Sequence, residues 1–160
     1  MFLKKEGFKF KFIFIGAKGN KDVYKYLSSL GENVEIIDEL EWHEEGAVAE
    51  ALKKYQIDIG VAPINEDKFS KAKCAFKIVE YMAVGLPVIV SPVGEQEVVT
   101  RDLLDGFHAR GKEEWVKYLK QLSDVKLREK MGASGQKRIK ESYSYKFILP
   151  GVYKEIKNIF

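Results

Sequence analysis

The chain has 160 residues, which is enough for one domain with one hydrophobic core and too few for two ordinary domains. Its net charge of +3 at pH 7 is too small to indicate nucleic-acid binding by itself. A single cysteine cannot form an internal disulfide, and no apolar run approaches the roughly 20 residues that span a bilayer. These features argue against an integral membrane protein and a disulfide-rich secreted module, and they favour a cytoplasmic protein.

Apolar periodicity and β-branched residues predict strands that alternate with helices along the chain. The predicted strands cover 9–16, 34–37, 57–63, 87–91 and, more briefly, 107–109. The predicted helices cover 23–30, 48–55, 75–84, 115–122 and 125–141, and a last helix follows Pro150 and covers 152–159. A polar loop is expected from 65 to 73.

This alternation predicts the fold class. Short parallel strands need crossover connections, and helices are the usual crossovers. The near-continuous apolar runs at 12–15 and 86–90 are typical of strands covered on both faces. We therefore predict a single α/β domain over residues 1–160, with a doubly wound parallel sheet flanked by helices. Ligands in such folds bind beyond the carboxyl ends of the strands, which here are the loops 16–20, 38–42, 63–77 and 91–96.

The segment 73–89 carries the residues best suited to bind a ligand. A helix that begins near Ala75 presents amides without helical partners, and its dipole favours an anion there. Lys73 and Lys77 add positive charge, and Glu80 lies about one turn after Lys77 on the same face. A cation beside a carboxylate suits a nucleotide, with phosphate on the amides and lysine and the ribose hydroxyls on the carboxylate. An ordinary capped helix with an ion pair between Lys77 and Glu80 accounts for the same residues equally well.

The same segment also resembles a known family. The pattern is Asp58-Ile59-Gly60-Val61-Ala62-Pro63, then Lys73-Cys74-x-x-Lys77-x-x-Glu80-Tyr81-Met82-Ala83-x-Gly85-x-Pro87-Val88-Ile89, then Ser91-Pro92-Val93-Gly94. It is similar to the C-terminal, nucleotide-sugar-binding domain of family 4 glycosyltransferases, one half of the GT-B fold. The resemblance covers nearly the whole chain and implies that the predicted sheet is Rossmann-like.

The resemblance implies a retaining transfer of a sugar from a UDP- or GDP-linked donor to an acceptor, in polysaccharide or glycoconjugate synthesis. Glu80 matches the glutamate that binds the donor ribose, amides matching 75–78 meet the diphosphate or the sugar, and the loop at 38–40 lies near the base. The residues expected to bind the donor are Glu80, Lys77, Lys73, Ala75, Phe76, Ile78, Leu40 and Gly16.

The sequence departs from the family pattern at two points, which change the expected sugar contact and the expected activity. Many members carry a second glutamate eight positions before the one that matches Glu80, and here that position is Ala72. The loop at 65–73 must then supply any sugar contact differently, through Asp67 or Lys73. Family domains also usually open with a strand and helix that precede the strand at 10–16, and residues 1–8 match only the tail of that helix. We therefore expect a fragment whose partner is a missing N-terminal acceptor-binding domain, without catalytic residues of its own and inactive alone.

The loop Gly16-Ala17-Lys18-Gly19 follows the first predicted strand and has two interpretations. Glycines there allow close approach to a phosphate with Lys18 above it, but the spacing is neither G-x-G-x-x-G nor a Walker A sequence. A tight strand-to-helix turn that needs glycine conformations is the favoured interpretation.

Other features of the sequence carry weaker expectations. With one cysteine, two isolated histidines and no Asp-x-Asp pair, no metal or other cofactor is expected. Cys74 is expected to pack rather than react. The basic stretch 126–146 is interpreted as solvated helix faces, with contact to a partner domain or to anionic lipid at the membrane as the alternative. A non-catalytic docking domain that uses this stretch is the alternative function.

Overall fold

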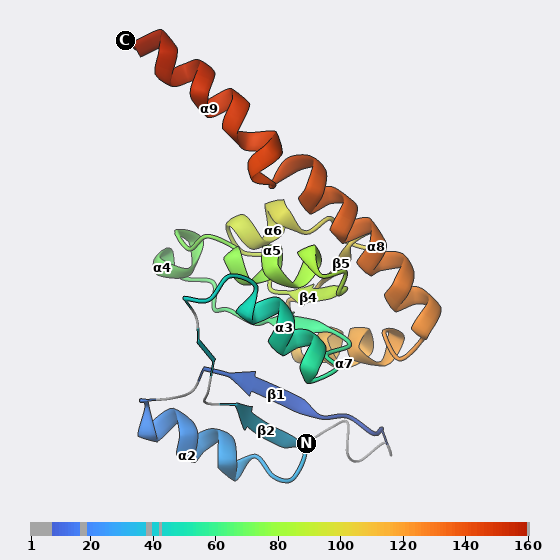
Figure 1. The fold of residues 1–160 in the computed structure, drawn as a ribbon. Helices are drawn as coiled ribbons and strands as arrows, with labels where there is room; N and C mark the ends of the chain where they lie inside the picture. The colour runs from blue at the N-terminus through green and yellow to red at the C-terminus, as the bar shows by residue number, and fades with distance from the viewer. Residues whose placement is uncertain (1–7, 17–18, 38–39, 42, 160) are drawn as a thin grey trace. The chain divides into compact units, whose positions relative to one another are not determined.

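The computed structural model describes residues 8–16, 19–37, 40–41 and 43–159 (Figure 1). It divides into two compact units, Met1–Tyr55 and Gln56–Phe160, and each is described by itself.

The first unit contains a two-stranded parallel sheet. Strands β1 (Phe12–Ile15) and β2 (Val34–Ile37) pair in register, with Phe12 opposite Val34. Helix α2 (Lys21–Ser29) follows β1, and α3 (Ala47–Lys54) follows β2. All four residues of β1 are partly exposed, so the predicted fully covered strand is wrong here. The physical reason is that this unit holds a two-stranded sheet on which α2 packs against β2, so the faces of β1 are covered incompletely.

The second unit contains a three-stranded parallel sheet in the order β3-β4-β5. Its strands are β3 (Gly60–Ala62), β4 (Val88–Val90) and β5 (Gly106–His108). Its helices are α4 (Lys68–Lys71), α5 (Phe76–Ala83), α6 (Glu95–Val99), α7 (Lys112–Gln121), α8 (Val125–Ser142) and α9 (Tyr145–Ile159). The prediction of parallel strands flanked by helices is confirmed.

The core of the second unit lies on both faces of β4, whose three residues are completely buried. Val88 and Val90 pack in one cluster with Ile78 and Met82 of α5. On the opposite face, Ile89 packs in a second cluster with Phe107, Leu122 and the flank of α7. Helices α5 and α7 therefore lie on opposite sides of β4 (Figure 1), as alternating side chains of one strand require.

Two helices of the second unit are not predicted, and the predicted start of its last helix is wrong. The loop predicted at 65–73 contains the one-turn helix α4, which Asp67 caps, and the loop predicted at 91–96 leads into the unpredicted helix α6. Both helices are too short to show an apolar period. The last helix begins at Tyr145 rather than after Pro150, because Ser144 accepts hydrogen bonds from the amides of Phe147 and Ile148 and starts the helix earlier.

Candidate functional site

The N-terminal end of α5 opens at the carboxyl edge of the β3-β4-β5 sheet. The Ala75 carbonyl accepts hydrogen bonds from the amides of Ile78, at 2.9 Å, and Val79, at 3.1 Å. No side chain of Ala75 caps the helix, and the preceding amides of Phe76 and Lys77 have no acceptor within the helix itself. The end of α5 therefore offers backbone donors and the positive end of a helix dipole to an anion.

Charged side chains surround this helix end. Lys73 and Lys77 are exposed, and the Lys73 ammonium lies 4.5 Å from the centre of the Phe69 ring. Glu80 is half-buried one turn further along α5. Burial raises the pKa of Glu80, and the positive charge of Lys77 partly offsets that rise. A carboxylate that is costly to bury and lies near the exposed Lys77 ammonium is suited to accept hydrogen bonds from a ligand.

The loops beside α5 are tied to each other. The buried Ser91 hydroxyl accepts a hydrogen bond from the amide of Ile64 at 3.1 Å, which joins the segments that follow β4 and β3. With its amide nitrogen turned toward the sheet, Gln96 donates to the carbonyls of Ala62 and Ser91 at 3.0 Å each. At Gly94 (φ 58°), a Cβ would lie 2.6 Å from the Lys71 carbonyl oxygen. Side-chain hydrogen bonds to the backbone and one close backbone approach therefore hold the loops at this edge of the sheet.

Asp67 has a structural role that its sequence position did not indicate. Its carboxylate accepts a hydrogen bond from the Ser70 amide at 2.7 Å and another from the Ser70 hydroxyl at 3.1 Å, which caps α4. The hydrogen bond from the Ser70 amide is the largest of the effects that lower the pKa of Asp67. The suggested contact of Asp67 with a sugar stays a prediction.

The side chain of Cys74, which precedes α5, is exposed, so the expected packing role of this cysteine is wrong.

The predicted site residues fall into both units. Lys73, Ala75, Phe76, Lys77, Ile78 and Glu80 all lie at or within two turns of the start of α5 in the second unit. Ala75 and Ile78 are buried, so only their backbone groups are candidates for contact with a ligand.

Gly16 and Leu40 lie in the first unit. Gly16 donates its amide to the Ile37 carbonyl at 2.9 Å, and both Gly16 and Gly19 have left-handed backbones, which agrees with the tight-turn interpretation. The other predicted residues of these two loops, Ala17, Lys18 and 38–39, lie outside the described residues, as do residues 1–7 of the predicted helix tail.

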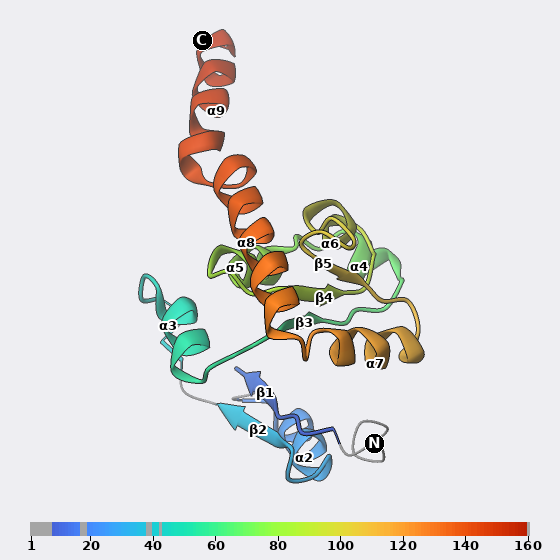
Figure 2. The ribbon, with the colours of Figure 1, turned by 90° about the vertical axis from the view of Figure 1, so that its right-hand side faces the viewer.

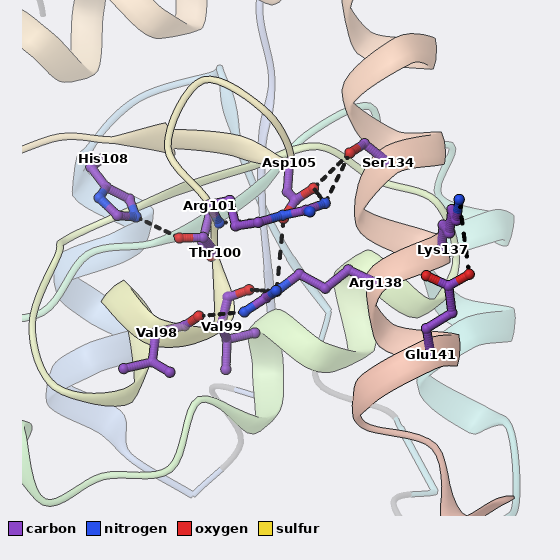
Figure 3. Close-up of polar contacts among 10 residues, drawn as sticks. All are labelled: Val98, Val99, Thr100, Arg101, Asp105, His108, Ser134, Lys137, Arg138 and Glu141. Atoms are coloured by element: carbon purple, nitrogen blue, oxygen red, sulfur yellow. Dashed lines mark hydrogen bonds and ion pairs between the residues drawn. The ribbon is translucent and has the colours of Figure 1, made fainter. Parts of the chain in front are cut away.

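A buried polar network joins α8 to the end of α6 and to the segment before β5, and the sequence did not predict it (Figure 3). The side chain of Asp105 is completely buried, and it accepts hydrogen bonds from Arg101 and from the Ser134 hydroxyl of α8, the latter at 2.8 Å. Arg138 of α8 donates to the carbonyls of Val98 and Val99, each at 2.8 Å. The network fastens α8 to the end of α6. Arg101 and Asp105 are spaced i,i+4, but nothing in the sequence indicates the depth of Asp105 or its distant partners on α8.

No described helix is long and apolar enough to cross a membrane. No three His, Cys, Asp or Glu side chains in the described ranges gather closely enough to hold a metal ion.

Comparisons with known proteins agree with the observed architecture. The family profile described as "Glycosyl transferases group 1" matches residues 2–124 of this chain. The crystal structure of the C-terminal domain of a glycosyl transferase group 1 family protein from Francisella tularensis superposes with a TM-score of 0.67 at 22% identity. That match covers 89% of this chain and 73% of the other, and at this identity it supports the fold alone. No match to the chain was found among curated proteins.

Proposed function

The chain belongs to the group 1 glycosyl transferases, and from this premise we propose that it binds the nucleoside-diphosphate sugar donor at the N-terminal end of α5. A glycosyltransferase acts on a sugar donor and an acceptor. The proposal assigns the donor's diphosphate to the first amides of α5 with Lys73 and Lys77, and its ribose hydroxyls to the carboxylate of Glu80. The expectation that Gly16 and Leu40 of the first unit bind the donor stays a prediction from the sequence.

One observation carries this proposal, namely the pairing of an open helix end with a half-buried carboxylate. Helix α5 begins at Phe76 without a side-chain cap, and the exposed Lys77 lies in its first turn. Glu80 follows on the same face and has a pKa raised by burial. A diphosphate needs several donors and positive charge, whereas a ribose diol needs an acceptor for two hydroxyl hydrogens. The diphosphate and the ribose of a nucleoside diphosphate match, in that order, the open helix end and the carboxylate of Glu80.

The proposed chemistry is a transfer with retention of configuration. The bond between the sugar's anomeric carbon and the diphosphate oxygen breaks, a bond from that carbon to the acceptor oxygen forms, and the departing phosphate takes the acceptor's proton. Lys77 and the α5 amides stabilise the negative charge that develops on the departing diphosphate. In this scheme, no side chain of the chain acts as general base and no metal ion takes part.

The proposal also gives the chain a partner. The acceptor is held by a separate N-terminal domain, and transfer belongs to polysaccharide or glycoconjugate synthesis. The chain by itself is then expected to bind the donor nucleotide without transferring its sugar. Mixing the chain with UDP-glucose or GDP-mannose should give no more release of free nucleotide than buffer does.

Calorimetric titration with UDP, GDP and ADP tests the donor site. Saturable binding of one nucleotide is expected, and Glu80→Ala should weaken it by roughly 10- to 100-fold, since a hydrogen bond to a charged group contributes about 1.5–3 kcal/mol. Lys77→Ala should weaken it as well. Glu113→Ala, an exposed carboxylate in the first turn of α7, is the matched control and should leave the affinity unchanged. Equal affinity in the Glu80 and control variants, with both folded by circular dichroism, would reject the assignment.

A further inference from the structure

The segment between β3 and α5 carries an ammonium group held over an aromatic ring. The Lys73 ammonium lies 4.5 Å from the centre of the Phe69 ring, close enough for a cation–π contact. Both side chains are exposed, Phe69 to 75%. Among the described residues, Lys73 forms no ion pair with a carboxylate. The segment therefore holds a positioned positive charge that the fold itself does not neutralise.

The two acidic side chains of this segment already have partners. The Oε1 atom of Glu66 lies 3.0 Å from the Nζ atom of Lys71. One carboxylate oxygen of Asp67 accepts a hydrogen bond from the Ser70 amide, and the other accepts one from the Ser70 hydroxyl. The next acidic residue along the chain is Glu80, one turn into α5. In this described segment, hydrogen-bond donors and positive charge are therefore available to a ligand, whereas both carboxylates are engaged.

The backbone of the segment is anchored at the edge of the sheet where α5 begins. Ser70 of α4 is buried, and its carbonyl accepts a hydrogen bond from the Lys73 amide at 3.2 Å. A Cβ on Gly94, at the start of α6, would lie 2.6 Å from the Lys71 carbonyl oxygen, so α4 packs closely on the loop that follows β4. Figures 1 and 2 show α4 near the start of α6. The backbone that carries Phe69 and Lys73 is therefore held at the carboxyl edge of β4.

The order of groups along a nucleotide sugar brings its sugar to this segment. This step rests on the proposed function, in which Glu80 binds the ribose and the first amides of α5 bind the diphosphate. Ribose and sugar are attached to opposite ends of the diphosphate. Because Glu80 lies one turn into α5, the sugar lies on the other side of the diphosphate, where the chain enters the helix. Lys73 and Phe69 are the positioned side chains on that side.

We propose that Lys73 and Phe69 bind the donor's sugar and select a sugar that carries a carboxylate, namely a hexuronic acid. A neutral hexose offers hydroxyl groups alone, whose hydrogens need acceptors that this segment has already engaged. A sugar carboxylate needs a cation instead. The Lys73 ammonium has three N–H donors, so it can contact the sugar carboxylate and a diphosphate oxygen together. The Phe69 ring holds the ammonium in place, which lowers the entropy lost when the sugar binds.

Calorimetric titration of the chain with matched donors tests the proposal. UDP-glucuronate should bind about five-fold more tightly than UDP-glucose, the ratio that corresponds to the ~1 kcal/mol of a good exposed ion pair. GDP-mannuronate and GDP-mannose are the corresponding pair for a site that takes GDP. Added salt should reduce the preference, because exposed charges are screened. Equal affinities for the acidic and the neutral donor would overturn the proposal and leave the nucleotide site standing, whereas no binding of any of these nucleotides would reject both.

Variants test the two side chains separately, with the ratio of the two affinities as the readout. Lys73→Gln should remove the preference, and the ratio is insensitive to the general loss of nucleotide affinity that the diphosphate contact of Lys73 also implies. The matched control is Lys68→Gln, which removes the same charge from an exposed position of α4 and should keep the ratio.

The ring of Phe69 has its own pair of variants. Phe69→Leu should reduce the preference, and Phe69→Tyr should preserve it, because tyrosine keeps an aromatic face beneath the ammonium. A preference that survives Lys73→Gln would place the sugar carboxylate elsewhere and contradict the proposal. Equal losses of preference in the Lys73 and Lys68 variants would reduce the effect to net charge and contradict it as well.

Discussion

Arg101 holds the buried carboxylate of Asp105 with two parallel hydrogen bonds. The Arg101 Nε lies 2.8 Å from one carboxylate oxygen, and a terminal guanidinium nitrogen lies 2.7 Å from the other. Ser134 of α8 donates to the same carboxylate, so one acidic side chain joins the segment between α6 and β5 to α8. Because Asp105 is completely buried, its pairing is required for this part of the fold and is open to direct test.

Asp105→Ala should lower the free energy of unfolding by about 3 kcal/mol, since it removes one partner of a buried ion pair and takes away the acceptor of the Ser134 hydroxyl hydrogen. This expected loss lies at the lower end for broken buried ion pairs, because the Arg101 side chain is 43% exposed and water can hydrate it after the change. Urea unfolding followed by circular dichroism measures the loss. Glu129→Ala, at an exposed position of α8, is the control and should change the free energy little.

The same carboxylate should give the protein an acid-sensitive stability. Burial raises the pKa of Asp105, but the hydrogen bonds from Arg101 and Ser134 outweigh burial and hold that pKa below its ordinary value. The unfolded chain then binds the proton more readily than the folded chain, so the stabilisation is complete above the unfolded pKa of about 4 and is lost as the pH falls through the lower folded value.

Unfolding curves measured from neutral pH down to about pH 2 check this acid dependence. The wild-type curve should lose more stability at the acid end than that of Asp105→Asn, which cannot ionise. Parallel losses in the two proteins would show that other carboxylates control the acid transition.

Gly132 allows α8 to touch the turn that precedes β4. A Cβ on Gly132 would lie 1.9 Å from the Gly85 carbonyl oxygen, a backbone atom that cannot move aside cheaply. Gly132→Ala should therefore destabilise the protein by about 2 kcal/mol through overpacking. Gly151→Ala on α9 is the control, because nothing lies within 4 Å of its Cβ and alanine favours a helix. Thermal unfolding distinguishes the two, and equal melting temperatures would refute the close approach.

Replacing Glu80 should have different effects on nucleotide affinity and on the free energy of unfolding. Since burial raises its pKa, the folded state favours the protonated form, and the contribution of Glu80 to stability falls as the pH rises through that pKa. At neutral pH, Glu80→Gln should therefore leave the free energy of unfolding unchanged or raise it, while nucleotide affinity declines. Urea unfolding and calorimetry on the same preparation measure both. A variant that loses stability and affinity together would indicate a structural role for Glu80.

Much of the fold could be predicted from local pattern. The strand at 34–37 and the helix beginning at Val125 have the predicted positions, because each depends on residues that are neighbours in sequence. Helices α4 and α6 could not be predicted, since each spans five residues or fewer and depends on a cap or a tight turn rather than on an apolar period. The start of α9 differs from the prediction because Pro150 favours a helix that begins after it, whereas the Ser144 hydroxyl accepts a hydrogen bond from the Phe147 amide at the actual start.

For the candidate site, sequence alone identified the lysines and Glu80 around the start of α5, because helical spacing fixes which side chains share a face. It could not reveal that Glu80 is half-buried, that Asp67 caps α4 or that Asp105 is completely buried. Burial and pKa depend on atoms brought together from distant parts of the chain, as Ser134 is brought to Asp105 across 29 positions. The sequence by itself determined the alternation of strands with the longer helices and the identity of the charged groups, whereas tertiary packing decided which of those groups are buried, paired or left facing solvent.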